Sequence, residues 1–198
     1  MRIVAATQNK HKIEEMSAIT AAFGMQMVSR REAGVPDFEI EEDGETFEEN
    51  SEKKAFEIMM ACKEISIADD SGLMVDALDG APGVYSARFA GEECDDEKNN
   101  QKLLLLMKDV PKEKRTAKFV SVITMIYPNG EKIVARGECR GHILYEERGK
   151  NGFGYDPLFM PEGFQQSFAE ISAEEKNKIS HRAIALQKLR ERLNEKIV

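Results

Sequence analysis

Ile67-Ala68-Asp69-Asp70-Ser71-Gly72-Leu73 is the stretch that decides the fold, because a short apolar run leads directly into two adjacent carboxylates and a glycine. Such a run is typical of a buried strand in an α/β sheet, which delivers polar side chains to the crevice at its carboxyl end. Successive strand residues point to opposite faces, so Asp69 and Asp70 cannot both enter one pocket in the same way. We therefore expect one aspartate to do chemistry or hold a cation, and the other to support it. A solvated turn is the alternative that these residues leave open.

The composition is that of an ordinary globular chain. Its 198 residues are 41% hydrophobic, which is enough for a full core and favours a single domain over residues 1–198. No apolar run approaches the roughly 18 residues of a membrane span, and the apolar start of the chain is too short for a secretory signal. We expect a cytoplasmic protein with no membrane partner.

The charge balance and the cysteines exclude several other classes. A formal net charge of −8 argues against broad nucleic-acid binding, which depends on Lys and Arg that neutralise phosphates. A small anion can still bind where lysines, helix amino ends or a carboxylate-held metal gather. Cys62, Cys94 and Cys139 are far apart, so we expect reduced thiols and neither a disulfide framework nor a cysteine metal site.

The amino-terminal segment has the pattern of an anion-binding turn. A strand is expected over Arg2–Ala6, and apolar residues then recur at helical spacing from Ile13 to Phe23. The polar segment 7–12 between them lies where the unpaired N–H groups and the dipole of a helix would face an anion. It has neither of the two glycine-rich nucleotide fingerprints. Alternatively, Thr7 or Asn9 simply caps the helix and the lysines are solvated.

A second helix is predicted after an acidic loop. Thr46 and Glu49 have the spacing of a capping box, and an apolar stripe follows through Ala55 and Ile58. Glu49 is ambiguous, because capping alone would explain it. Lys54 lies on another face of the same helix, where a lysine is by default solvated.

The remaining pattern predicts a mixed sheet. Leu73–Val75 indicates a short separate segment, 102–108 a helix, and the runs 117–127 and 132–139 two strands joined by an Asn-Gly hairpin turn. A second capping box at Ser172 opens a closing helix that carries Ser180-His181-Arg182 near its start.

The loop Gly152-Phe153-Gly154-Tyr155-Asp156-Pro157 combines glycines, which allow close approach of the backbone to a ligand, with aromatic rings that offer a stacking surface. Alternatively, the segment is a glycine-proline turn whose aromatic rings belong to the hydrophobic core.

Taken together, these motifs resemble the inosine/xanthosine triphosphate pyrophosphatase family, and the match runs nearly end to end. One small departure is Ser51, where relatives often carry alanine. The motifs that carry the resemblance are Thr7-x-Asn9-x-x-Lys12, Thr46-Phe47-Glu48-Glu49-Asn50 with Lys54-Ala55, Ala68-Asp69-Asp70-Ser71-Gly72-Leu73, Gly80-Ala81-Pro82-Gly83-Val84-Tyr85-Ser86-Ala87-Arg88, Gly152-Phe153-Gly154-Tyr155-Asp156-Pro157 and Ser180-His181-Arg182.

The resemblance implies roles for named residues. Asp70 would accept a proton from water and, with Lys54, form the catalytic pair. Mg²⁺ would be held by Glu49 and Asp70, with Glu41 as an additional ligand. Phe153 would stack on the purine. The residues implied to contact the substrate are Thr7, Gln8, Asn9, Lys10, His11, Lys12, Ser71, Phe153, Gly154, Tyr155, Asp156, Lys176, His181 and Arg182.

The implied fold is an α/β protein with an elongated mixed sheet flanked by helices, in two lobes with a central substrate cleft, commonly as a homodimer. The implied reaction is Mg²⁺-dependent hydrolysis of XTP, ITP and dITP to the monophosphate and pyrophosphate, which cleanses the nucleotide pool. Donors aimed at a 6-keto oxygen would reject ATP, because adenine presents an amino group there.

Three rival functions are weighed against this one. A haloacid-dehalogenase-type phosphatase needs Asp-x-Asp, whereas Asp69 and Asp70 are adjacent. A related pyrophosphatase for modified pyrimidine nucleotides stays open. A nucleotide-binding regulator would bind ITP without turnover, but it has no need of a carboxylate placed to activate water.

Overall fold

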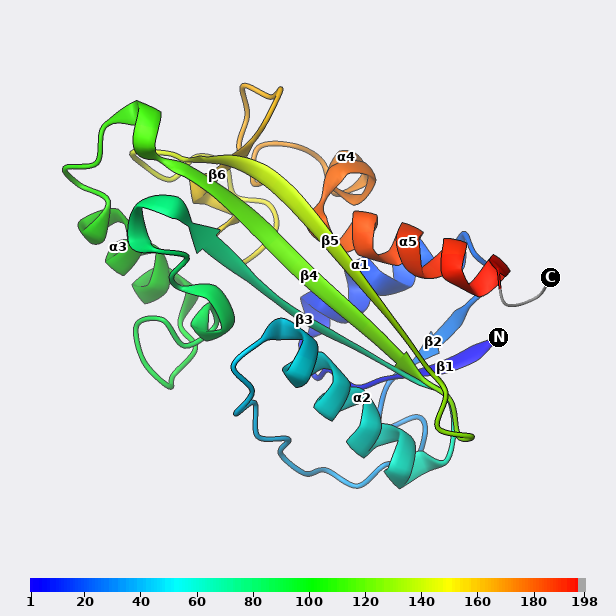
Figure 1. Ribbon diagram of the computed structural model, residues 1–198. Helices are drawn as coiled ribbons and strands as arrows, with labels where there is room; N and C mark the ends of the chain where they lie inside the picture. The colour runs from blue at the N-terminus through cyan, green and yellow to red at the C-terminus, as the bar shows by residue number, and fades with distance from the viewer. Residues whose placement is uncertain (196–198) are drawn as a thin grey trace. The chain divides into compact units, whose positions relative to one another are not determined.

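A computed structural model describes residues 1–195 of the chain as an α/β protein (Figure 1). Within these residues one sheet has the strand order β2-β1-β3-β4-β5-β6. The strands are β1 (Arg2–Ala5), β2 (Gln26–Val28), β3 (Ser66–Val75), β4 (Thr116–Ile126), β5 (Lys132–Ile143) and β6 (Phe159–Pro161). The helices are α1 (Lys10–Ala21), α2 (Phe47–Cys62), α3 (Asp96–Leu106), α4 (Ala173–Ile179) and α5 (His181–Glu195).

The sheet is mixed, as predicted. β1 pairs in parallel with both β2 and β3, whereas β5 and β6 pair antiparallel. β4 and β5 are neighbours joined by the predicted turn, in which Gly130 N–H donates to the carbonyl of Tyr127. Gly130 takes a φ of +87°, which is the reason for glycine at this turn.

The chain divides into two compact units. Unit 1 comprises residues 1–70, 121–137 and 182–198, of which the structure describes those up to 195, and unit 2 comprises residues 71–120 and 138–181. β3, β4 and β5 each contribute one part to unit 1 and the other part to unit 2. The expectation of a single domain stays a prediction.

In unit 1, α1 and α5 cover one face of the sheet and α2 the other (Figure 1), and an apolar cluster lies on each face. On one face, Met16 of α1 and Leu186 of α5 pack with Ile67 of β3. On the other face, Ile58 of α2 packs with Ala68, the next residue of β3. The alternation along β3 therefore extends to Asp69 and Asp70, which follow Ile67 and Ala68 in the same order.

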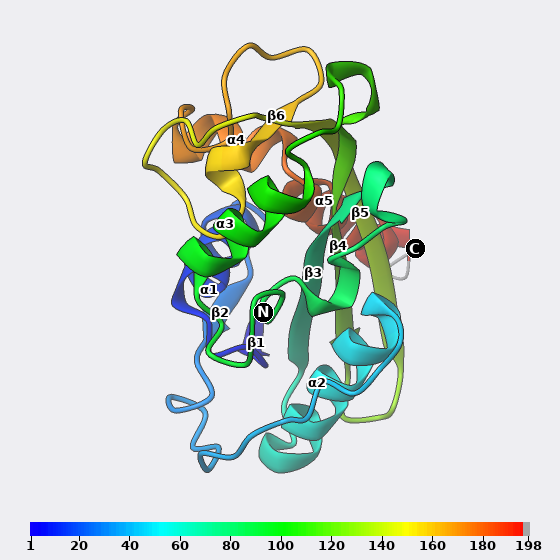
Figure 2. The ribbon, with the colours of Figure 1, turned by 90° about the vertical axis from the view of Figure 1, so that its left-hand side faces the viewer.

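The loop between β2 and α2 in unit 1 is long and leads to the capping box (Figure 2). Thr46 accepts a hydrogen bond from the Glu49 N–H, and the Glu49 carboxylate accepts one from the Thr46 N–H, so the predicted helix start is confirmed. Figure 2 shows this loop leaving the end of β2 and entering α2.

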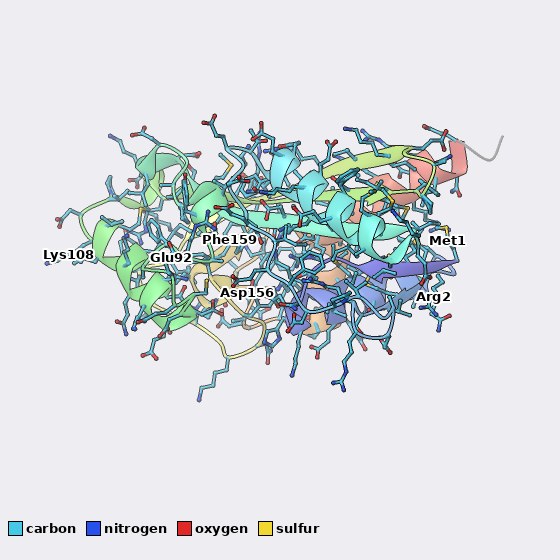
Figure 3. The ribbon with its side chains drawn as sticks, turned by 90° about the horizontal axis from the view of Figure 1, so that it is seen from below. Met1, Arg2, Glu92, Lys108, Asp156 and Phe159 are labelled. Atoms are coloured by element: carbon cyan, nitrogen blue, oxygen red, sulfur yellow. The ribbon has the colours of Figure 1, made fainter. Side chains whose placement is uncertain are left out.

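Unit 2 has its own core, built on aromatic rings. Phe119 of β4 packs against Phe159 and Phe168 with centroid separations of 4.7 and 5.9 Å. Phe159 and Asp156, both labelled in Figure 3, belong to the segment that forms β6 and the turn before it. The aromatic loop that the sequence marked is thus anchored beside a packed core.

Several predicted boundaries are wrong. The helix expected over 102–108 is α3, which begins at Asp96 and ends at Leu106. Two further differences concern β3 and the closing helix. β3 does not end at the aspartates but continues to Val75, so Leu73–Val75 is part of the same strand. The last β1–β3 pair is Ala5 with Ile67, so the aspartates lie beyond the end of β1, although not beyond the end of their own strand. The closing helix is also two helices, because Ser180 takes an extended ψ of 157° and separates α4 from α5.

No helix within residues 1–195 has the length and the apolar run that crossing a bilayer requires.

In unit 2, the buried side chain of Arg115 forms hydrogen bonds with the segment after α3 and with the end of β5. Arg115 is 2% exposed, and its guanidinium donates to the carbonyls of Met107, Val110, Ile143 and Leu144 at 2.6 to 3.3 Å. Without the guanidinium these carbonyl oxygens would lose hydrogen bonds in a largely buried environment, which costs free energy.

Replacing this arginine tests that role. We expect Arg115→Met to lower the free energy of unfolding by about 3 kcal/mol, because several buried carbonyls lose their donor together. Urea titration measures the change. Arg148→Met is the control, since Arg148 pairs with Glu170 at the surface and should cost much less. Equal losses in the two variants would contradict the assignment.

Candidate active site

The carboxylate of Asp69 is the centre of the charged cluster in unit 1. It is 0% exposed and accepts hydrogen bonds from Lys12 Nζ at 3.0 Å, from an Arg182 guanidinium nitrogen at 3.0 Å and from the Ser121 hydroxyl at 2.5 Å. Burial would raise its pKa, but Arg182 and Lys12 hold the pKa of this carboxyl well below its usual range. Asp69 is therefore ionised and fully occupied, which suits a supporting residue.

Asp70, on the opposite face of β3, is held differently. Its Oδ1 accepts from Lys54 Nζ at 2.7 Å, and the same ammonium lies 3.2 Å from the Glu42 carboxylate. Burial raises the pKa of Asp70 to about 6, against the opposing pull of Lys54. Burial disfavours the charge of Lys54, but Asp70 and Glu42 raise its pKa, so the lysine stays protonated. A carboxyl with a pKa of about 6 is suited to accept a proton near neutral pH.

The polar segment before α1 forms the expected helix amino end. Asn9 is the N-cap, and its Oδ1 accepts from the Lys12 N–H, while Thr7 Oγ1 accepts from the Asn9 N–H. Gln8 reaches into the long loop and donates to Asp37. The capping interpretation of Asn9 is thus correct, and the positive end of the α1 dipole lies at this segment.

The other predicted residues of this segment lie at the surface. Lys10 and His11 begin α1, and both are exposed, with His11 4.0 Å from Glu14. Lys12 is the member of the segment that turns inward, toward Asp69.

The predicted metal ligands do not form one group. Among residues 1–195, no three or more His, Cys, Asp or Glu side chains are placed together to hold a metal ion. Glu49 Oε2 accepts from the Glu45 and Thr46 N–H groups, so its side chain is used in the helix cap. Glu41 is exposed, and the carboxylate that shares Lys54 with Asp70 is its neighbour Glu42. Within the described residues, Glu41, Glu49 and Asp70 are thus not gathered into a three-carboxylate set, and the roles of Glu41 and Glu49 as metal ligands stay predictions.

The arrangement still fits a metal held by fewer protein ligands. Oδ2 of Asp70 is buried and has no hydrogen-bond partner among the described residues. With Glu42 beside the same lysine, two carboxylates are available, and Mg²⁺ is commonly bound by one or two carboxylates together with phosphate oxygens of a substrate.

In unit 2, a second charged pair organises the aromatic loop. Asp156 Oδ2 accepts from Lys176 Nζ at 2.6 Å and from the Phe153 N–H at 3.0 Å, and Lys176 Nζ lies 5.0 Å from the centre of the Phe153 ring. Gly152 takes a φ of +73°, and a Cβ there would lie 2.0 Å from Asp156 Oδ2, so this position requires glycine. Phe153 thus lies beside a cation that is itself held by Asp156.

The remaining predicted residues of unit 2 are placed as follows. Tyr155 is buried and donates to the carbonyl of Ser86, and His181 stacks on Phe119 at 4.7 Å. Gly154 follows Phe153, and Ser71 is a half-buried residue of β3. Their contacts with a substrate stay predictions.

The family resemblance implies that Arg182 frames a base, whereas in the structure its guanidinium forms ion pairs with two carboxylates of unit 1. It belongs to unit 1, is 1% exposed and pairs with Asp69 and Glu15. A role of Arg182 toward a base stays a prediction.

Sequence reasoning missed Glu42, Glu15 and Ser121. The run Glu41-Glu42-Asp43 contains no signal that selects one carboxylate, because it lies in a loop without periodicity. Ser121 looks like any small residue in a buried strand, and Glu15 like a solvated residue of α1.

Unit 1 thus has the features of an acid-base site for an anionic substrate: an inward lysine, the amino end of a helix and a buried carboxyl with a raised pKa. The family model described as the Ham1 family matches residues 3–192. The chain therefore belongs to the Ham1 family.

Similar proteins agree over nearly the whole length. A dITP/XTP pyrophosphatase of Desulforamulus reducens is 52% identical over 195 residues, 98% of this chain and 96% of that protein. One of Clostridium perfringens is 49% identical over 198 residues, 97% of each. The solved structure of the Staphylococcus aureus Ham1 protein superposes with a TM-score of 0.87 at 41% identity, covering 99% of this chain and 100% of that one. The family resemblance and the α/β fold class are confirmed.

The raised pKa of Asp70 makes a prediction about stability in metal-free buffer. A carboxyl whose pKa is higher in the folded protein than in the unfolded chain stabilises the fold at low pH, and this contribution is lost as the pH rises through the folded value. Between about pH 4 and pH 7 the protein should therefore lose about 2 kcal/mol through Asp70. Asp70→Asn should escape this loss.

Urea titrations of both proteins at several pH values, with a chelator present, measure the difference. We expect Asp70→Asn to gain relative stability as the pH rises. Glu52→Gln is the control, because Glu52 is a half-exposed carboxylate of α2 that pairs with Lys132. A stability difference between Asp70→Asn and wild type that does not change with pH would refute the assignment.

Proposed function

We propose that this protein hydrolyses the non-canonical purine nucleoside triphosphates dITP, XTP and ITP to the monophosphate and pyrophosphate, and so cleanses the nucleotide pool. The observation that carries the proposal is the pairing of buried Asp70 with Lys54, 2.7 Å apart, in a chain of the Ham1 family. The names of the relatives, dITP/XTP pyrophosphatases, support the same activity.

The triphosphate would be bound by residues of unit 1. The N–H groups at the start of α1, capped by Asn9, and the ammonium groups of Lys12 and Lys54 offer positive potential to phosphate oxygens. Thr7, Gln8, Lys10 and His11 complete the proposed phosphate-binding segment. These groups do not neutralise all of the negative charge of a triphosphate, which is the reason that a divalent cation is needed.

We propose Mg²⁺ as that cation, with Asp70 and Glu42 as its protein ligands. The orphaned Oδ2 of Asp70 and the neighbouring Glu42 fit a small oxygen-liganded ion, and when bound it would neutralise phosphate charge and make water more acidic. Glu41 and Glu49 stay further candidates from the sequence.

Hydrolysis requires a base near the attacking water. In the proposed mechanism, Asp70 accepts the proton from water as it attacks the α-phosphorus, and pyrophosphate leaves. The carboxyl must be ionised, so activity should fall as the pH drops through the pKa of Asp70, which a bound cation would lower from its metal-free value of about 6. Lys54 holds Asp70 in place and offsets the charge that develops on phosphate oxygens. Asp69 takes no proton in this scheme, because its pKa is low and its oxygens are occupied.

The base would be bound mainly by residues of unit 2. Phe153 would stack on the purine, and Lys176 beside it is a donor for a 6-keto oxygen. Adenine has a 6-amino group, which would face this donor unpaired, so ATP should be a poor substrate. Asp156 would hold Lys176 and the loop, while Gly154, Tyr155, His181, Arg182 and Ser71 are proposed to complete the contacts.

The family resemblance also suggests a homodimer and a cytoplasmic location, and we propose both. The molar mass in solution, by light scattering, tests the dimer.

The central experiment is pyrophosphate release from ITP, XTP, dITP, GTP, ATP and CTP, with Mg²⁺ and with excess chelator. Keto purines should be cleaved in Mg²⁺ and hardly at all in chelator. Saturable ITP binding without pyrophosphate release would instead indicate a regulator, and a preference for CTP would indicate a pyrimidine enzyme.

Asp70→Asn should fold and bind nucleotide, yet lose about 10²- to 10⁴-fold in kcat, which is the usual contribution of a positioned general base. Glu52→Gln should retain wild-type turnover. A fully active Asp70→Asn enzyme would remove Asp70 from the mechanism.

Phe153→Ala should raise KM for ITP about tenfold or more with a smaller change in kcat, because stacking on an aromatic ring contributes about 1–3 kcal/mol per base. Phe89→Ala is the control, since Phe89 is also a half-buried ring of unit 2 but has no proposed role. An unchanged KM in Phe153→Ala would mean that the ring is only part of the core.

A further inference from the structure

Two side chains of α3 hold both polar backbone groups of Gly154. Asp96 Oδ2 accepts from the Gly154 N–H at 2.8 Å, and Asn100 Nδ2 donates to the Gly154 carbonyl at 3.1 Å. The two residues are four apart in the helix, so their side chains lie on one face, one turn from each other. The backbone of Gly154 is therefore clamped from both sides by one rigid element.

The clamped residue is the one that follows Phe153. Gly154 takes a φ of +61°, a left-handed conformation that requires support from its surroundings or a glycine, and here it has both. Because the direction of a side chain depends on the backbone beside it, a shift of this peptide would also shift the Phe153 ring.

The rest of the loop is held by its own side chains. Asp156 accepts from the Phe153 N–H, and the Tyr155 hydroxyl donates to the Ser86 carbonyl. The hydrogen bonds from Asp96 and Asn100 instead connect the loop to a helix that lies 54 to 58 residues away in the sequence.

The environment of Asn100 does not favour the stability of the fold. It is 4% exposed, and its Oδ1 is buried without a hydrogen-bond partner among the described residues. Burying such an oxygen destabilises the fold, so an apolar residue would serve stability better. The bond to Gly154 is what the asparagine adds.

The neighbouring Asn99 is a natural comparison. It is equally buried on α3, and its side chain accepts from the Ala90 N–H and donates to the Ala87 carbonyl. It therefore holds a different loop, and both of its polar atoms are used.

We propose that Asp96 and Asn100 are positioning residues that fix the Gly154 peptide and thereby align the Phe153 ring for stacking on the substrate base. This inference rests on the proposed function, because it assigns to α3 a part in binding the purine.

Asn100→Asp is the main test, because it keeps the size of the side chain and replaces the donor to the Gly154 carbonyl by an acceptor. We expect KM for ITP to rise about tenfold with kcat within about twofold of wild type. Inhibition by inorganic tripolyphosphate, which has no base, should be unchanged. Asp96→Ala, at an exposed position that tolerates truncation, should raise KM in the same way.

The decisive readout is coupling to the ring. In the Phe153→Ala background, Asn100→Asp and Asp96→Ala should have little further effect on KM, because the ring they align is gone. Asn99→Asp is the matched control. Any effect that it has on KM should be the same in the wild-type and the Phe153→Ala backgrounds. Thermal melting of each variant shows whether it is folded.

An unchanged KM in folded Asp96→Ala, or additive effects with Phe153→Ala, would overturn the proposal. A weakened tripolyphosphate inhibition in both variants would do the same, since it would indicate a general disturbance of the protein. These outcomes are distinct from failure of the proposed function, in which the wild-type protein would release no pyrophosphate from any nucleotide.

Discussion

The buried carboxylate of Asp69 is the constraint on which unit 1 depends. A charge without solvent exposure is tolerated only when it is paired, and the partners here come from α1, α5 and β4 through Lys12, Arg182 and Ser121. These elements must therefore assemble around β3 for the chain to fold. The same pairing removes Asp69 from acid-base chemistry, because its pKa lies well below the usual range.

Asp70 is the next residue, yet its environment produces the opposite behaviour. It faces α2 and the single ammonium of Lys54, with the Glu42 carboxylate close by, and its pKa rises to about 6. Two identical side chains in sequence thus have different charge states because the strand points them to different faces. This division between a structural and a reactive carboxylate fits a hydrolase, and the family relationship supports that interpretation.

The sequence predicted what depends on local pattern. Sequence spacing predicts the capping box at Thr46 and the cap at Asn9. Strand alternation predicts that Asp69 and Asp70 have different roles. The sequence could not predict contacts set by tertiary packing. Nothing local shows that β3 continues to Val75, or that Glu42 rather than Glu41 reaches Lys54, because both depend on which segments pack beside them.

The alternation along β3 limits how this protein can vary in length. A deletion or insertion of one residue between Ser66 and Asp70 would turn every following side chain to the other face and exchange the surroundings of the two acids. Such a change would leave the amino-acid composition almost the same but would destroy both charge arrangements at once. Gaps among homologues should accordingly fall in loops such as 30–45, and the spacing between the apolar run and the acid doublet should be invariant.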